Sequence, residues 1–162
     1  MDNHTDNAAG DRTLTDGVGF LLARASGLLA RAGNAALAAF GLRVRSYSVL
    51  LLACEAAEGI SQRDLACVLG LDPSQVVLLV DDLAGAGLVE RRPSPSDRRT
   101  KLVAATPTGR ALRAEAVAAV AAAEEEQLAA LPAVERRRLH DLLLRVVGDV
   151  VECRPAVPSD PS

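Results

Sequence analysis

The sequence has very few aromatic residues: one Tyr, two Phe and no Trp among 162 residues. The core must therefore be packed mainly from Leu, Val and Ala, which dominate the 49% of residues that are hydrophobic. Ala-rich helices pack closely, but each of them buries little apolar area. This shortage of large side chains favours burial of further surface against a second copy of the chain.

Long hydrophobic runs are also missing, because no segment approaches the roughly 20 apolar residues that a membrane-spanning helix needs. Residues 1–12 are polar and lack the apolar stretch of a secretory signal peptide. The three cysteines, Cys54, Cys67 and Cys153, are odd in number and far apart, which favours reduced thiols over a disulfide framework. We therefore expect a cytoplasmic protein with no membrane partner.

Residue groupings typical of catalytic or metal sites are absent as well. His4 and His140 have no nearby ligand spacing, and the sequence contains no phosphate-binding glycine loop and no triad-like set. We therefore expect no enzymatic activity, no metal and no cofactor. A net charge of −3 excludes a generally basic coat for nucleic acid, so any DNA contact must come from a local cluster of positive charge.

Two short helices with clear capping signals are predicted between residues 61 and 87. Ser61 is a favourable N-cap, and Gly70 suits the left-handed end of the first helix. Asp72 and Pro73 then open the second helix. Apolar residues at spacings of three and four line both: Leu65, Val68, Leu69, Val76, Leu79, Val80 and Leu83. Two short helices joined by a Gly-containing turn predict a helix-turn-helix.

A basic β-hairpin is expected next, with strands over 88–92 and 100–105 and a Pro- and Ser-rich turn between them. Five basic side chains lie on it: Arg91, Arg92, Arg98, Arg99 and Lys101. A helix-turn-helix followed by such a hairpin is a winged helix. Its second helix can enter the major groove of DNA, and its hairpin arginines can reach phosphates or the minor groove.

Long helices flank this motif on both sides. Apolar periodicity predicts one helix over about 14–40, and Thr106 and Pro132 mark the starts of two more. We predict a mainly α fold with a small β-hairpin wing and long helices that form a dimerisation region; a monomer with a long helical extension is the alternative. The expected segments are a disordered tail 1–12, a first dimerisation helix 13–45, a winged helix-turn-helix unit 46–105, C-terminal dimerisation helices 106–152 and a loose tail 153–162.

Four short motifs follow one another in the central part of the chain: LGLDPS at 69–74, LVDDL at 79–83, GLVERRPSPSDRR at 87–99 and TPTGR at 106–110. In this order and spacing they resemble the multiple-antibiotic-resistance regulator (MarR) family of bacterial transcription regulators. The resemblance implies a homodimer that represses transcription from a pseudo-palindromic double-stranded DNA operator and responds to a small-molecule effector. It also implies that Arg99 contacts DNA and that Asp97 holds the hairpin tip through a salt bridge.

Predicted base contacts lie on the second motif helix, away from its apolar face. Ser74 and Gln75 stand at its amino end, and Gln75 has the donor and acceptor that match adenine N6 and N7; plain polar surface is the alternative. Val77 and Leu78 stand where members of this family carry Ser or Thr and often Arg. They can pack on a thymine methyl group, although burial of Leu78 against another helix is equally consistent with the sequence. Asp82 replaces a common basic residue, which predicts weaker DNA affinity.

Predicted contacts to the DNA backbone and minor groove are all arginines. Arg98 and Arg99 at the hairpin tip suit an A·T-rich minor groove, where the negative potential is enhanced. Arg91 and Arg92, together with Arg63 near the start of the first motif helix, are predicted to contact phosphates. A solvated charge run is the alternative.

The resemblance also implies an effector pocket where the first, second and fifth helices meet. Around it the chain offers Tyr47, Leu50, Cys54 and Arg43, with ordinary packing as the alternative. A ligand there would change the distance between the two recognition helices. Two other functions stay open: a dimer with weakened DNA binding that acts through protein interaction, and a redox-responsive regulator that uses Cys54 or Cys67.

Overall fold

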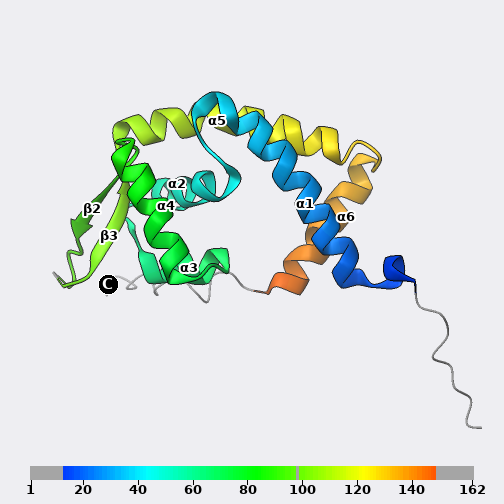
Figure 1. Cartoon of the computed structure of the whole chain (residues 1–162), viewed down its shortest axis with the longest axis horizontal. Helices are drawn as coiled ribbons and strands as arrows, with labels where there is room; N and C mark the ends of the chain where they lie inside the picture. Colours follow the sequence, from blue (N-terminus) through cyan, green and yellow to red (C-terminus); the bar gives the residue numbers. More distant parts are fainter. Residues whose placement is uncertain (1–12, 98, 149–162) are drawn as a thin grey trace, which may run out of the picture.

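The computed structural model describes residues 13–97 and 99–148, and is mainly helical with one small sheet (Figure 1). Its elements are η1 (Leu14–Asp16), α1 (Val18–Leu37), η2 (Ala38–Phe40), α2 (Val44–Glu55), β1 (Ile60–Ser61), α3 (Gln62–Leu69), α4 (Pro73–Gly85), β2 (Val89–Pro93), β3 (Lys101–Ala105), α5 (Pro107–Gln127) and α6 (Ala133–Val147). In Figure 1, α2, α3, α4 and the hairpin lie at one end, α6 lies at the other, and α5 runs along the top. The predicted fold class is confirmed.

The two motif helices occupy their predicted positions. Ser61 Oγ accepts a hydrogen bond from the backbone N–H of Asp64 at 3.1 Å, which caps α3. Gly70 ends α3 with φ of 60°, a left-handed conformation that glycine adopts without strain. Pro73 is the first residue of α4, where its missing N–H does no harm, although the side chain of Asp72 forms no capping hydrogen bond.

The sheet contains three antiparallel strands in the order β1-β3-β2. Val89 lies opposite Ala105 and Pro93 opposite Lys101, so β2 and β3 form the predicted hairpin. On the other edge of β3, Ile60 pairs with Val103. Strand β1 was not predicted because two residues carry too little periodicity to distinguish a strand from a loop.

The core joins the winged motif to the end of α1. Leu37 of α1, Leu50 of α2, Leu65 of α3, Val76 of α4 and Val103 of β3 are all fully buried within it. The core is therefore built from aliphatic side chains, as the shortage of aromatic residues requires. Shared burial fixes the orientation of α4 relative to the hairpin.

Helix α5 is anchored to the base of the hairpin at its first turn. Thr106 Oγ1 accepts a hydrogen bond from the N–H of Gly109 at 3.0 Å and donates one to the carbonyl of Gly87 at 2.7 Å. Gly109 lies so close to the carbonyl of Leu88 that no Cβ fits there. Thr106 and Pro107 thus open α5 as predicted, and the long helix starts from a rigid junction.

The ends of the first two long helices differ from the sequence prediction. The segment predicted as one helix over 14–40 consists of η1, α1 and η2, because Gly17 has an extended backbone and separates η1 from α1. Helix α2 starts at Val44, whose N–H donates to Asn34 Oδ1 of α1 at 2.8 Å. That contact starts α2 two residues before Ser46, where the winged helix-turn-helix unit was predicted to begin.

Much of the apolar surface of α1 and α6 is exposed in the single chain. Val18 is 70% exposed and Val146 is 73% exposed. The other exposed large apolar residues of η1, α1 and α6 are Leu14, Phe20, Leu21, Leu22, Leu28, Val134, Leu142, Leu144 and Val147. Within the described ranges, α6 makes no extensive contact with another element. Val150 and Val151, two further apolar residues that follow α6 in the sequence, lie outside the described residues.

The prediction of reduced cysteines is confirmed for Cys54 and wrong for Cys67. Cys54 is free, whereas Cys67 is in a disulfide. A disulfide depends on the distance between two Cα atoms in space, and separation along the sequence does not determine that distance. Cys153 lies outside the described residues.

No single helix in the described part of the chain is long and apolar enough to cross a membrane. Val18–Phe40 and Val44–Glu55 pass that test as a pair, by length and composition, but are bent by 70° relative to each other.

Candidate nucleic-acid interface

Helix α4 has one buried and one exposed face. Val76 and Val80 are fully buried, and Ser74 and Gln75 in the first turn are exposed. Leu78 is 66% exposed, so no helix of the described single chain buries it. The reason is geometric: residues two positions from Val76 and Val80 on a helix point away from the core.

The exposed face of α4 carries acidic but no basic side chains. Asp81 and Asp82 lie near its carboxyl end, and no Lys or Arg occurs between Pro73 and Gly85. Asp81 Oδ1 accepts a hydrogen bond from Arg91 Nη2 of β2 at 2.6 Å and forms an ion pair with it. The pair ties α4 to the hairpin and neutralises one of the two carboxylates.

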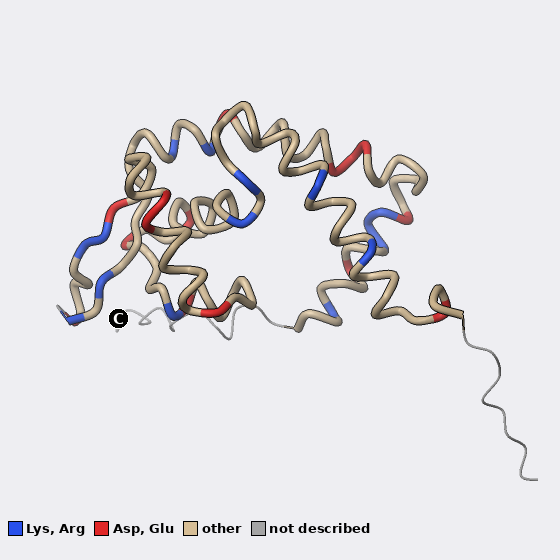
Figure 2. The backbone as a smooth tube through the Cα atoms, in the orientation of Figure 1, with Lys and Arg blue, Asp and Glu red and all other residues tan. Residues whose placement is uncertain are grey.

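The hairpin concentrates positive charge beside α4, as Figure 2 shows for its Lys and Arg residues. Arg92 donates from Nη2 to the carbonyl of Ala57 at 3.2 Å and from Nε to the carbonyl of Glu58 at 3.3 Å. Arg91 and Arg92, both predicted as phosphate ligands, thus have partners within the protein. Lys101 is exposed on β3.

The tip of the hairpin is a hydrogen-bonded turn. Asp97 Oδ1 accepts from the backbone N–H of Arg99 at 3.0 Å, and Asp97 Oδ2 accepts from Thr100 Oγ1 at 3.0 Å. The N–H of Ser94 donates to the carbonyl of Thr100 at 2.8 Å and closes the turn. Among the described residues Asp97 forms no salt bridge, so these hydrogen bonds support the tip and hold the backbone of the exposed Arg99. Arg98 lies outside the described residues.

The structure does not bring the four predicted effector-pocket residues together. Tyr47 and Leu50 are buried in the core, whereas Arg43 is exposed at the amino end of α2. Cys54 lies near the other end of α2 and lines a cavity of about 160 Å³. Arg63, the remaining predicted DNA ligand, is exposed in the first turn of α3.

Sequence reasoning missed the other residues that line this cavity, which are Glu55, Arg110 and Arg113. Arg110 Nη1 donates to the carbonyl of Cys54 at 2.8 Å, and Arg113 Nε is buried without a hydrogen-bond partner within the described structure. The two arginines stand three residues apart in α5, a spacing that places them on one helix face. That spacing was the available signal, but the sequence did not show that α2 ends beside it.

Burial raises the pKa of the Cys54 thiol, and the nearby guanidinium groups of Arg110 and Arg113 oppose the shift. Since the thiolate is the nucleophilic form, a raised pKa makes Cys54 less reactive at neutral pH than an ordinary cysteine.

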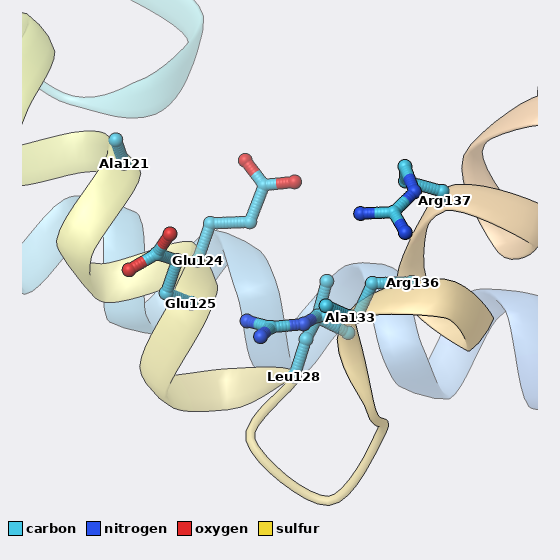
Figure 3. Close-up of a pocket in the computed structure, with 7 residues that line it drawn as sticks. All are labelled: Ala121, Glu124, Glu125, Leu128, Ala133, Arg136 and Arg137. Atoms are coloured by element: carbon cyan, nitrogen blue, oxygen red, sulfur yellow. The ribbon is translucent and has the colours of Figure 1, made fainter.

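A second cavity, of about 360 Å³, lies between α5 and α6 (Figure 3). It is lined by Ala121, Glu124, Glu125, Leu128, Ala133, Arg136 and Arg137. Acidic side chains from α5 and basic ones from α6 thus line one space, yet no salt bridge joins the two helices in the described structure. Groups of three or more His, Cys, Asp or Glu side chains that could hold a metal ion are absent from residues 13–97 and 99–148.

Comparison with known proteins places the winged motif in a family. The model of the MarR family matches residues 46–101. The HTH-type transcriptional repressor Rv2887 of Mycobacterium tuberculosis is 32% identical over 132 residues, which cover 82% of this chain and 94% of that protein.

Two solved structures are similar over most of the chain. A MarR-family transcriptional regulator from Rhodococcus sp. RHA1 is 49% identical with a TM-score of 0.80, over 84% of this chain and 96% of the other. CouR from Rhodococcus jostii RHA1, bound to p-coumaroyl-CoA, is 47% identical with a TM-score of 0.75, over 92% of this chain and 100% of the other. The similarity extends well beyond the winged motif to the flanking helices.

Proposed function

Because this chain belongs to the MarR family of transcription regulators, we propose that it is a cytoplasmic repressor that binds a pseudo-palindromic double-stranded DNA operator as a homodimer. The observation that carries the proposal is that α4 exposes Ser74, Gln75, Val77 and Leu78 beside a hairpin with an exposed arginine at its tip. Helix α4 would enter the major groove, and Arg99 would reach the minor groove.

The exposed apolar surface supports a second copy as the partner. An isolated 15-residue helix is marginal in water, and α6 has that length and no extensive contact within the described chain. Mutual burial of the apolar residues of α1 and α6 would stabilise both helices. In such a dimer the two copies of α4 would lie about 34 Å apart, the distance between successive major grooves on one face of DNA.

We propose that an aromatic carboxylic acid or its coenzyme A thioester is the effector. CouR is bound to p-coumaroyl-CoA, and Rv2887 has been crystallised with p-aminosalicylic acid. The proposed effector-binding residues are Tyr47, Leu50, Cys54 and Arg43. Because these residues do not form one pocket in the described structure, effector binding would require the helices around them to move apart. An effector would release DNA only if it binds the DNA-free arrangement of the dimer more tightly than the DNA-bound one.

The test is a selection from a random-sequence duplex library at moderate salt, with the purified full chain as bait. The proposal expects enrichment of a sequence with two related halves, and a DNA complex that contains two copies of the protein. Addition of p-coumaroyl-CoA or p-aminosalicylic acid should lower the affinity for the enriched duplex. Enrichment of no sequence would contradict the proposal.

A second candidate function follows from the charge on α4. Because this helix has no basic side chain and carries Asp81 and Asp82, its affinity for DNA is expected to be reduced. The corresponding function is a MarR-like dimer that acts through protein interaction. The same selection distinguishes the two functions, since this one expects a stable dimer without an enriched duplex.

A further inference from the structure

The middle of α4 exposes two apolar side chains and has no basic side chain. Val77 is 40% exposed and Leu78 is 66% exposed. Leu78 lies one helical turn after Ser74 and Gln75, on the same face of the helix. The outward surface of α4 therefore changes from polar to apolar within one turn.

The surroundings of these two side chains favour nucleic acid as the partner. One turn further along, Asp81 is neutralised by Arg91 at 2.6 Å, and the exposed cations Arg99 and Lys101 lie on the neighbouring hairpin. A partner must therefore supply negative charge to the hairpin and both polar and apolar groups to α4. The major groove of DNA supplies all three, because phosphates flank it and the C5 methyl group of thymine lies in it beside hydrogen-bonding base edges.

On the basis of the proposed function, we propose that Leu78, with Val77 beside it, contacts the C5 methyl group of a pyrimidine in each operator half-site. Part of the sequence preference then depends on a methyl group instead of a hydrogen bond. The ligand is duplex DNA with thymine, or 5-methylcytosine, at that position. Uracil or unmethylated cytosine there is bound more weakly.

The first experiment uses the wild-type chain and a duplex enriched from the random-sequence library. Each thymine is replaced in turn by uracil, which keeps the base-pairing and hydrogen-bonding groups and removes the methyl group alone. Affinity is measured by fluorescence anisotropy. We expect binding to weaken about fourfold for one particular thymine in each half-site, the factor that corresponds to one methyl-sized group withdrawn from water.

Two variants then assign the contact to a residue. In Leu78→Ala the penalty for uracil at the sensitive position should disappear, because the side chain that senses the methyl group is gone. In Gln75→Ala, a matched change on the same face of α4, the uracil penalty should remain while overall affinity or base preference changes. The uracil penalty is the ratio of the affinities for the thymine and uracil duplexes, measured within each variant. A general loss of affinity lowers both affinities and therefore leaves this ratio unchanged.

Three results would overturn the inference: no thymine of the enriched duplex is sensitive to uracil, Leu78→Ala keeps the full uracil penalty, or Leu78→Ala weakens self-association in analytical ultracentrifugation. The last result would mean that a second copy covers this side chain. Failure to enrich any duplex would refute the proposed function itself, whereas an enriched duplex without uracil sensitivity would refute the methyl contact alone.

Discussion

The arginines of the hairpin differ in whether other groups of the protein already bind their side chains. Arg91 binds Asp81, and Arg92 binds the carbonyls of Ala57 and Glu58. Each guanidinium group is bound by these partners, so an approaching phosphate must compete with them. Arg99 has no such side-chain partner within the described structure and is exposed. DNA contacts from the hairpin should therefore depend more on Arg99 than on the two β2 arginines.

Replacement of Arg99 by Ala should weaken the proposed DNA binding by about 1–3 kcal/mol and leave the proposed dimer intact. The reason is the loss of a cation at the exposed tip of a turn whose backbone Asp97 still supports. Fluorescence anisotropy would measure the affinity for DNA, and sedimentation velocity would show whether the variant is still a dimer. Arg45→Ala, which removes an exposed arginine from α2, is the matched control. Equal effects of the two substitutions would count against a contact from the hairpin tip.

Replacement of Asp81 by Asn should strengthen DNA binding at low salt. The change removes a negative charge from α4 and releases Arg91, so the plot of log Kd against log salt should steepen by about 0.9 per additional phosphate contact. Asp82→Asn removes an equal charge without releasing an arginine, because Asp82 forms no ion pair in the described structure. A smaller increase in DNA affinity is expected for Asp82→Asn. Unchanged or weaker DNA binding by Asp81→Asn would disprove the proposed role of the Asp81–Arg91 pair.

Cys54 should be alkylated by iodoacetamide more slowly at pH 7 than a cysteine in an unfolded peptide. Burial raises its pKa, so less thiolate is present at this pH. Because the folded-state pKa lies above the unfolded one, the associated stability is present below the unfolded pKa and is lost as pH rises through the folded value. Mass spectrometry of the peptide that contains Cys54 gives the rate. Fast alkylation at pH 7 would instead support the redox-responsive alternative.

At the scale of elements, the junction of the hairpin and α5 has the tightest packing requirement. Gly109 contacts the Leu88 carbonyl, and a Cβ there would also lie 3.1 Å from Leu50 Cδ1. Because Leu50 belongs to the core and Leu88 precedes β2, any shift of this turn would move α5 relative to the hairpin. The junction therefore determines how the long helices are placed relative to the proposed DNA-binding surface.

Replacement of Gly109 by Ala should lower the free energy of unfolding by about 1–3 kcal/mol, because the added methyl group overpacks the junction. Gly85→Ala is the matched control, since a Cβ at Gly85 would meet nothing within 4 Å. This control should be neutral or stabilising by up to about 1 kcal/mol, because alanine loses less backbone entropy in a helix. Urea unfolding of both variants provides the measurement, and similar stability losses would contradict the packing argument.

Local signals predicted the ends of the two motif helices and the start of α5 correctly, but they did not predict the start of α2. Ser61, Gly70, Pro73 and Thr106 mark starts and ends that depend on the adjacent few residues, and each was assigned correctly. The start of α2 at Val44 depends instead on Asn34, ten residues away. Such a contact has no signature in the sequence around the helix end.

At the scale of the molecule, many large apolar residues of α1 and α6 are exposed to solvent in the described single chain, which is unfavourable for a monomer. Val18 and Val146 are 70% and 73% exposed. Exposed apolar patches of this kind mark interfaces. The cavity between α5 and α6 adds acidic and basic side chains next to the same region (Figure 3).

Replacement of Val146 by Asp should dissociate the proposed dimer at micromolar concentrations. A charge at a site that is exposed in the monomer changes stability by less than about 0.5 kcal/mol, whereas a charge buried between two copies costs far more. Sedimentation velocity gives the mass, and thermal unfolding at two protein concentrations gives the dependence of Tm on assembly. A variant that keeps the wild-type mass and Tm would show that this part of α6 is not in the interface.

The sequence by itself determined the winged motif, its charge distribution and the presence of long apolar-striped helices, because capping, periodicity and charge are local properties of the chain. The tertiary structure decided which of these residues are available for contacts with DNA or with an effector. It exposed Leu78, engaged Arg91 and Arg92 with internal partners, and buried Tyr47 and Leu50 in the core. These outcomes depend on distances between segments far apart in the sequence, which local patterns do not contain.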